Sequence, residues 1–368
     1  MARKLKSDRV LFLTTMGLVA ASVVMVYSAS NVLAMQTYGQ PNLFLVKQVM
    51  FSVIGIAVMF LAMAVDYRVY RDPRVIWTVV GCTLLALVAV LVIGPKINGT
   101  RRWFALGGVG IQPSELAKIA AILFTAAVLE RRMDRINDLK YSLAPIALLL
   151  AVMLGLILKE PDYGTAVAIL AIVGVMVFAA GLAYSYVGAL AITLVPIAGI
   201  IAWLPPYRVR RLMAFMNPWD DPLDAGFQAV QSMIAVGTGG VTGRGLGYSV
   251  QKLFYLPYPH TDFIYAVVAE ELGLIGATLI LVCFCVITWR GLRIVSRAPD
   301  AFGSFVALGL TAMIAVQAFF NMSMVLGLLP TKGITLPFVS AGGSSLIVSL
   351  AGMGVLLNIS QRASAVAE

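Results

Sequence analysis

The feature that most constrains this chain is the repeated occurrence of apolar stretches about twenty residues long. A helix of that length spans the roughly 30 Å hydrocarbon core of a bilayer, because each residue adds about 1.5 Å. Hydrophobic residues make up 60% of the 368 residues and charged residues only 12%, with a mean hydropathy of +0.93. These values exclude an ordinary soluble domain. The chain is therefore predicted to be an all-α polytopic membrane protein.

We predict about ten transmembrane helices in a single domain, residues 1–368. The spans are expected at residues 10–30, 44–65, 75–94, 114–130, 142–159, 163–181, 184–204, 262–289, 302–329 and 340–360. Between the seventh and eighth spans, residues 205–261 form one long loop. Within it, residues 226–236 are predicted to form a short amphipathic helix at the membrane interface.

The basic residues indicate the orientation. If the N-terminus is cytoplasmic, fifteen of the 27 Lys and Arg residues lie in short cytoplasmic segments, as the positive-inside rule requires. Both termini are then cytoplasmic and the long loop is extracytoplasmic. The first apolar segment is expected to be an uncleaved anchor, since its core is longer than that of a signal peptide.

Most of the other twelve basic residues fall in or near predicted outer loops. A basic outer face suits a substrate that carries phosphate, because Arg and Lys both neutralise it. The alternative for each residue is contact with lipid headgroups. The residues are Lys96, Arg101, Arg102, Lys159, Arg208, Arg210, Arg211, Arg244, Lys252 and Lys332.

Charged residues inside predicted spans indicate a polar interior. Glu270 and Glu271 lie about 12 Å along a helix that starts at Asp262. At that depth each costs about 2.5 kcal/mol or more unless it is paired, protonated or facing water. Glu115 and Lys118 are three residues apart in the fourth span and are predicted to form an internal ion pair.

Two aspartates each allow two interpretations. Asp262 lies where the long loop meets the eighth span, and the local interpretation is a helix N-cap worth about 1 kcal/mol. The alternative is a general base at the membrane surface. Asp162 lies in the turn at residues 159–165, where an ordinary outer turn is favoured over a functional site.

The segment at residues 237–247 contains six glycines in eleven residues. Glycines let the backbone approach a ligand and expose amides to an anion, and the alternative is a tightly turned loop without a ligand. Cys82, Cys283 and Cys285 are expected to be small apolar core residues. The single histidine, His260, excludes a multi-histidine metal site.

Five blocks of the chain carry a resemblance to a known family, at residues 98–103, 112–115, 161–165, 259–263 and 321–345. They resemble the SEDS proteins of bacterial shape, elongation, division and sporulation, which are of the FtsW/RodA/SpoVE type. The resemblance covers nearly the whole chain in order. Residues 243–252 look more like the division branch, FtsW, than the elongation branch, RodA. The chain departs from the family at Glu160, where Gln is usual, and at Pro259.

The resemblance implies a peptidoglycan glycosyltransferase that polymerises lipid II during septal cell-wall synthesis. The active site is then on the outer face of the bacterial cytoplasmic membrane. Asp262 is the implied general base of an inverting transfer to the acceptor 4-hydroxyl, with a polyprenyl pyrophosphate as leaving group. Three alternatives remain open: a lipid II flippase, a RodA-like polymerase of cell elongation, and a scaffold for a transpeptidase.

The predicted site has two sets of residues besides Asp262. The predicted substrate-binding residues are Arg101, Arg102, Lys159, Arg208, Arg210, Arg244, Lys252, His260, Lys332 and Ser344. The predicted cavity-shaping residues are Glu115, Lys118, Asp162, Glu270 and Glu271. No metal ligand is assigned, and the one cofactor considered is a divalent cation at the pyrophosphate. The expected partners are lipid II, the growing glycan strand, a class B penicillin-binding protein and other divisome or elongasome membrane proteins, with no nucleic acid.

Overall fold

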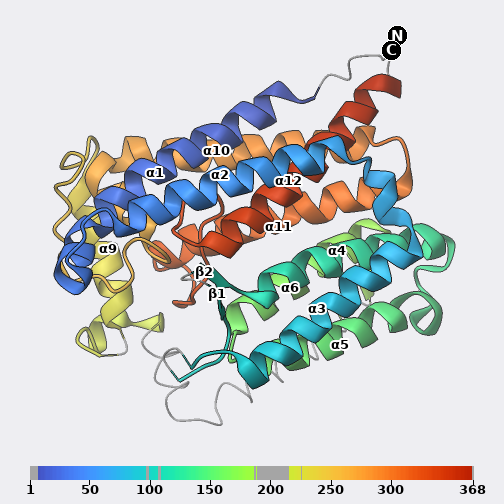
Figure 1. The fold of residues 1–368 in the computed structure, drawn as a ribbon, viewed down its shortest axis with the longest axis horizontal. Helices are drawn as coiled ribbons and strands as arrows, with labels where there is room; N and C mark the ends of the chain where they lie inside the picture. Colours follow the sequence, from blue (N-terminus) through green and yellow to red (C-terminus); the bar gives the residue numbers. More distant parts are fainter. Residues whose placement is uncertain are drawn as a thin grey trace.

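The computed structural model describes residues 7–96, 99–106, 109–185, 188, 215–224 and 226–366. Long helices dominate it and run roughly side by side (Figure 1). They are α1 (Arg9–Tyr38), α2 (Leu43–Ala64), α3 (Pro73–Ile93), α4 (Pro113–Arg132), α5 (Ala144–Lys159), α6 (Tyr163–Ala179), α9 (Phe227–Gly239), α10 (Ile264–Arg297), α11 (Ala301–Val325) and α12 (Gly343–Val366). The short elements are the helical turns η1 (Tyr67–Arg71), η2 (Met133–Arg135), η3 (Leu139–Leu143) and η4 (Pro218–Asp220), and the antiparallel strands β1 (Phe104–Leu106) and β2 (Val109–Ile111).

Seven helical segments among the described residues are long and apolar enough to cross a membrane. They are α1, α2, α3, residues 140–159 around α5, α10, α11 and α12. The helix α6 is equally apolar but shorter, and α4 is 20 residues long but more polar. The prediction of an all-α polytopic membrane protein is confirmed. The predicted seventh span at residues 184–204 lies almost wholly outside the described residues, so the count of ten stays a prediction.

The helix α10 differs most from its prediction. It is 34 residues long and contains a break at Gly273, whose φ of 67° and ψ of −164° are not helical. It begins at Ile264 after Phe263, and no side chain caps it. The local interpretation of Asp262 as the N-cap is therefore wrong, because the helix starts one residue too late for the Asp262 carboxylate to reach the required amides.

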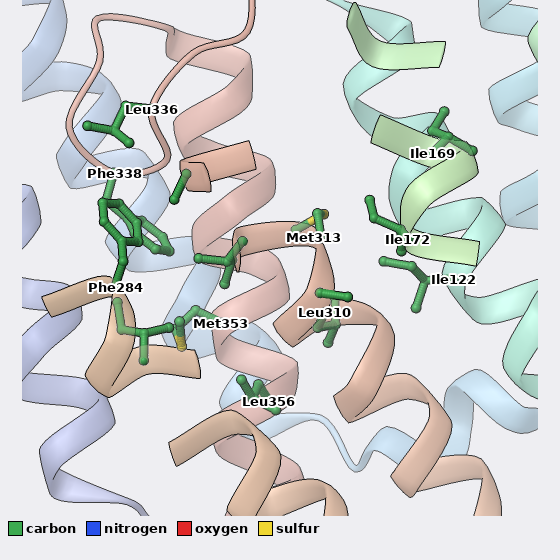
Figure 2. Close-up of a cluster of buried hydrophobic side chains, with 14 of the residues drawn as sticks. Ile122, Ile169, Ile172, Phe284, Leu310, Met313, Leu336, Phe338, Met353 and Leu356 are labelled. Carbon is green, nitrogen blue, oxygen red and sulfur yellow. The ribbon is translucent and has the colours of Figure 1, made fainter. Parts of the chain in front are cut away.

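The centre of the bundle is formed by α11 and α12. In each of them 78% of the apolar segment is buried, against 28% in α2 and α3, which must face lipid. Figure 2 shows the core around α11, where Met313 and Leu310 lie between residues of α6 and α12. The large apolar residues of the peripheral helices point outward, as expected in a membrane.

The start of α1 and the end of α12 lie at the same end of the bundle (Figure 1). The Asp8 amide donates to the Ser360 hydroxyl at 3.2 Å, and Arg290 forms an ion pair with Asp8 at 2.5 Å. At that end Arg362 also pairs with Asp66 of the connection after α2, at 3.0 Å. This agrees with the prediction that the two ends of the chain share one side.

The cysteines do not follow their prediction. Cys82 and Cys285 are exposed on the outer faces of α3 and α10, and Cys283 is half-buried. Lipid-facing positions accept small apolar side chains as readily as core positions do, which is why hydrophobicity alone did not separate the two.

Candidate active site

Two adjoining cavities lie around Asp262, at the end of the bundle where α4 and α6 begin. The first has a volume of about 230 Å³ and the second about 310 Å³. Asp262, Arg102, Asp162, Gly164 and Gly333 line both of them. The two form one divided cavity, with the Asp262 side chain where its parts meet.

The backbone around Asp262 is held by the C-terminal third of the chain. The Asn321 amide of α11 donates to the Asp262 carbonyl at 2.7 Å and to the Ile334 carbonyl at 2.8 Å. The Ser340 hydroxyl donates to the Thr261 carbonyl at 2.7 Å. These bonds fix the main chain on both sides of the carboxylate, so the side chain is presented from a rigid support.

Burial raises the pKa of Asp262 to about 6. A carboxylate prefers water to an apolar environment, and partial burial therefore favours its protonated form. With a pKa near 6 the group is still ionised at neutral pH, and it is a stronger base than an ordinary aspartate. Both properties suit proton abstraction from a hydroxyl group.

Asp162 joins the starts of α4 and α6. Its carboxylate accepts hydrogen bonds from the Gln112 amide at 2.8 Å and the Ser114 hydroxyl at 3.0 Å, and it caps α6 through the Thr165 amide at 3.2 Å. A negative charge is favourable at this helix N-terminus. The turn is therefore more than an ordinary connection, since its aspartate lies on the cavity wall.

The two adjacent arginines point to different places. Arg102 donates to the Glu160 carbonyl at 2.6 Å and to the Pro161 carbonyl at 2.8 Å, and it lines both cavities. A guanidinium has five N–H donors, so three remain for a ligand. Arg101 instead donates to the Leu91 and Val92 carbonyls at the end of α3, and it lines neither cavity.

The other charged residues of the cavity come from α4 and the loop before α12. The predicted ion pair between Glu115 and Lys118 is confirmed, with a separation of 2.7 Å, and both line the first cavity. Lys332 lines the second cavity, where its ammonium lies 5.3 Å from the centre of the Tyr163 ring.

Four predicted site residues form ion pairs away from the cavity. Arg244 pairs with Glu270 at 3.2 Å, and Lys252 pairs with Glu271 at 2.8 Å. None of the four lines either cavity. The acids are thus paired, the first of the alternatives that the sequence left open. Arg244 and Lys252 hold the loop against α10 instead of facing the cavity, because the two buried carboxylates of α10 require their charges.

The same loop explains the glycine-rich segment. The Arg244 and Gly245 amides donate to the Glu270 and Glu271 carbonyls, both at 3.0 Å. A Cβ atom at Gly243 would lie 2.2 Å from the Glu271 carbonyl oxygen. The backbone of this segment therefore packs closely against the break in α10, as expected for a tightly turned loop.

Three further predicted residues lie in the described part of the chain and do not line the cavities. Lys159 is exposed at the end of α5. His260 is buried with its ring 4.5 Å from that of Phe44, and burial lowers its pKa to about 4, so it is neutral. Ser344 is buried, while its neighbour Ser345 lines the first cavity. Arg208 and Arg210 lie outside the described residues.

Sequence reasoning missed two polar residues of α11. Gln317 lines the first cavity, and Asn321 holds the Asp262 backbone. Both are buried amides in an otherwise apolar stretch. Polar residues inside a span mark functional positions, so they carried a usable signal. In the part of the chain that the structure describes, no group of three or more His, Cys, Asp or Glu residues is placed to hold a metal ion.

The family model that describes a cell cycle protein of the FtsW, RodA and SpoVE type matches residues 8–365. A probable peptidoglycan glycosyltransferase FtsW of Geobacter metallireducens is 43% identical, over 96% of this chain and 95% of its own. The stage V sporulation protein E of Bacillus subtilis is 42% identical, over 98% of both chains.

Solved structures agree over the same length. A chain from a peptidoglycan synthase complex, in a study of how polymerization and crosslinking are coordinated, has a TM-score of 0.81 and 31% identity. The alignment covers 98% of this chain and 99% of that one. The rod shape determining protein RodA of Thermus thermophilus has a TM-score of 0.70 and 29% identity, with 97% of both chains covered.

Proposed function

Because this chain belongs to the FtsW/RodA/SpoVE family of cell cycle proteins, we propose that Asp262 is the general base with which it polymerises lipid II. The chain is a multi-pass membrane protein and a peptidoglycan glycosyltransferase of septal cell-wall synthesis, like its FtsW relatives. The observation that supports the proposal is the half-buried Asp262 carboxylate where the two parts of the cavity meet.

In the proposed reaction, the Asp262 carboxylate takes the proton of the acceptor 4-hydroxyl as its oxygen attacks the anomeric carbon of the donor. The bond from that carbon to the pyrophosphate oxygen breaks, and its electron pair leaves with the pyrophosphate. One displacement inverts the anomeric centre. The leaving group needs little acid assistance, so a single carboxylate suffices.

We propose Arg102 and Lys332 as the groups that stabilise the pyrophosphate charge. Both line the second cavity together with Asp262. Arg102 is held by two backbone carbonyls, so its guanidinium is oriented before substrate binds. Preorganised cations of this kind lower the barrier where charge develops. Glu115, Lys118 and Asp162 shape the wall of the adjoining part.

We also propose that a divalent cation could bind at the pyrophosphate. Asp162 and Asp262 both line the divided cavity, and Mg²⁺ beside substrate phosphates is commonly bound by one or two carboxylates, so these residues fit such an ion. Such an ion would neutralise the leaving group. The steps above use only side chains of this protein.

We further propose that the cavity end of the bundle faces the outside of the cytoplasmic membrane and that both termini are cytoplasmic. The positive-inside distribution of Arg and Lys supports this orientation. The expected partner is a class B penicillin-binding protein, because polymerised strands must be crosslinked. The similarity to a chain of a peptidoglycan synthase complex supports this partnership. Other divisome membrane proteins are proposed as further partners.

The proposal is tested with the purified full chain and lipid II. Asp262→Asn and Asp262→Ala should form no detectable glycan polymer while keeping the elution profile and thermal stability of the wild type. In the wild type, the rate should fall as the pH drops below about 6, because the base becomes protonated. Asp134→Asn, at the other end of the bundle, is the control and should polymerise normally. Polymer made by Asp262→Ala at the wild-type rate would disprove the role of Asp262.

A further inference from the structure

Another cavity, of about 340 Å³, lies at the opposite end of the bundle from Asp262 and is separate from the divided cavity. It is a groove between the start of α3, the end of α4 and the start of α5, three helices that lie together in Figure 1. Its apolar lining residues are Pro73, Ile76, Trp77, Leu84, Phe124, Ala127, Val128, Pro145, Leu148, Leu149 and Val152.

The groove opens to the surface that faces lipid. Trp77 is 62% exposed and Leu148 is 69% exposed, although both line the groove. Its floor is closed by Phe124, whose ring lies 5.6 Å from that of Trp77 in an edge-on arrangement. Because the groove is closed below and open at its side, an acyl chain can enter it from the bilayer.

The length of the groove matches one leaflet. The lining residues on α3 extend from Pro73 to Leu84, which is about 16 Å along a helix. Half of the hydrocarbon core is about 15 Å thick. An acyl chain that lies along α3 would therefore fill the groove from the interface to the middle of the membrane.

The mouth of the groove is basic. The charged residues in its lining are Arg131 and Arg132, from the last turn of α4. Arg132 is oriented by a hydrogen bond to the Tyr141 carbonyl and lies 4.6 Å from the centre of the Tyr141 ring. Arg131 is exposed and has no ion pair among the described residues. The nearby acid Glu130 pairs with Arg71 at 2.8 Å and does not line the groove.

We propose that this groove binds an anionic phospholipid of the leaflet opposite the active site. One acyl chain lies between α3 and α5, and the phosphate is bound by Arg131 and Arg132. Guanidinium groups bind phosphate through paired hydrogen bonds, and basic pockets between membrane helices favour anionic headgroups. The site is separate from the Asp262 cavity and does not depend on the reaction proposed there.

The test uses Trp77 as a reporter in the full chain. The other four tryptophans are replaced by phenylalanine, and the protein is placed in phosphatidylcholine vesicles that contain brominated phosphatidylglycerol or brominated phosphatidylcholine. Brominated chains quench a tryptophan only on contact. The anionic lipid should quench Trp77 at a roughly thirtyfold lower mole fraction, the factor expected for two cations at a membrane surface.

Three variants distinguish binding of the lipid headgroup from binding of the acyl chain. Arg131→Ala with Arg132→Ala should abolish the preference for the anionic lipid, and Arg293→Ala, on the exposed face of α10, should keep it. Val152→Phe should reduce quenching by both lipids because it fills the groove. Equal quenching by the two lipids, or a preference that survives the double arginine variant, overturns the proposal.

A second measurement does not need the tryptophan replacements. Native mass spectrometry of the otherwise unaltered chain should find bound phosphatidylglycerol that Arg131→Ala releases and Arg293→Ala retains. Equal retention by the two variants would overturn the assignment to Arg131.

Discussion

Arg101 and Arg102 have different surroundings although they are neighbours in sequence. Arg101 binds carbonyls at the end of α3, while Arg102 is anchored to the turn before α6 and lines the cavity. Because both residues lie in a predicted outer loop, the sequence predicted that both would bind substrate.

This difference predicts unequal kinetic effects. Arg102→Ala should lower kcat/KM for lipid II by roughly tenfold to a hundredfold, the usual range for loss of a charge-assisted phosphate contact. Arg101→Ala should change kcat/KM by less than threefold while lowering thermal stability. Steady-state polymerisation with both variants measures the contrast, and equal losses would contradict the proposed role of Arg102 in stabilising the pyrophosphate.

Glu160 is a buried acid next to the active site. Its side chain is fully buried, and neither carboxylate oxygen has a hydrogen-bond partner among the described residues. Burial, together with the charge of Asp162 and against the effect of Arg102, raises the pKa of Glu160 to about 8. In the folded protein the group is therefore neutral at pH 7, as a glutamine side chain would be.

A raised pKa makes Glu160 destabilising as the pH rises. The unfolded chain ionises near pH 4.5 while the folded chain keeps its proton to about pH 8, so the free energy of unfolding falls across that interval. Glu160→Gln should remove this loss, worth up to about 3 kcal/mol at pH 7. Melting temperatures in detergent should rise at pH 7.5 and change little at pH 5. The same gain at both pH values would contradict the mechanism, and Glu130→Gln, which breaks an ion pair with Arg71, is the control expected to lose stability.

At the scale of elements, the glycine-rich loop and the break in α10 form a matched pair. Gly243 and Gly273 both have positive φ, 80° and 67°, and the two backbones are in contact. The loop also supplies Lys252 to Glu271. The same segment therefore packs against the break in α10 and pairs with a buried acid beside it. The α10 break could not be predicted from hydropathy, since apolar residues predominate on both sides of Gly273.

Alanine at two glycines of this region should have opposite effects. Gly243→Ala places a Cβ against the Glu271 carbonyl at a positive φ and should destabilise the protein by about 1–3 kcal/mol. Gly237→Ala, in α9 with open space around it, should be neutral or stabilising by up to about 1 kcal/mol. Melting temperatures of the two variants decide the matter, and a stable Gly243→Ala would show that the loop does not pack as described.

The helices were largely predictable because each needs only length and apolarity, which are local properties. The site was predictable only in part. The Glu115–Lys118 pair follows from spacing on one helix, whereas the partners of Glu270 and Glu271 depend on a loop that folds back by about twenty residues. The amide of Asn321 in an apolar span was a usable signal, but its partner, the Asp262 carbonyl, is set by the tertiary fold and cannot be inferred from the local sequence.

At the scale of the whole molecule, a group of arginines lies at one end of the bundle and the active-site cavity lies at the other. The proposed cytoplasmic end carries the arginines around η1, η2 and the end of α10, and the opposite end carries the divided cavity. Arg68 and Arg71 of η1 are paired with acids, so the orientation depends on the sum of many basic residues and not on any one of them.

The orientation is testable with single cysteines in a chain that lacks its three native ones. In intact spheroplasts, a membrane-impermeant maleimide should label Leu223→Cys, which is 87% exposed before α9. It should label Asp134→Cys in η2 only after the membrane is opened. The reverse pattern would invert the proposed topology and place the Asp262 cavity inside.

The divided cavity is assembled from segments that leave the ribosome at very different times. Arg102 and Asp162 belong to the first half of the 368 residues, whereas Asp262 and Lys332 belong to the second. The amide that fixes Asp262 lies on α11, and the walls close with residues at the start of α12. The early helices therefore enter the membrane before the active site exists. A nascent chain should have no activity until its last helices have inserted and packed.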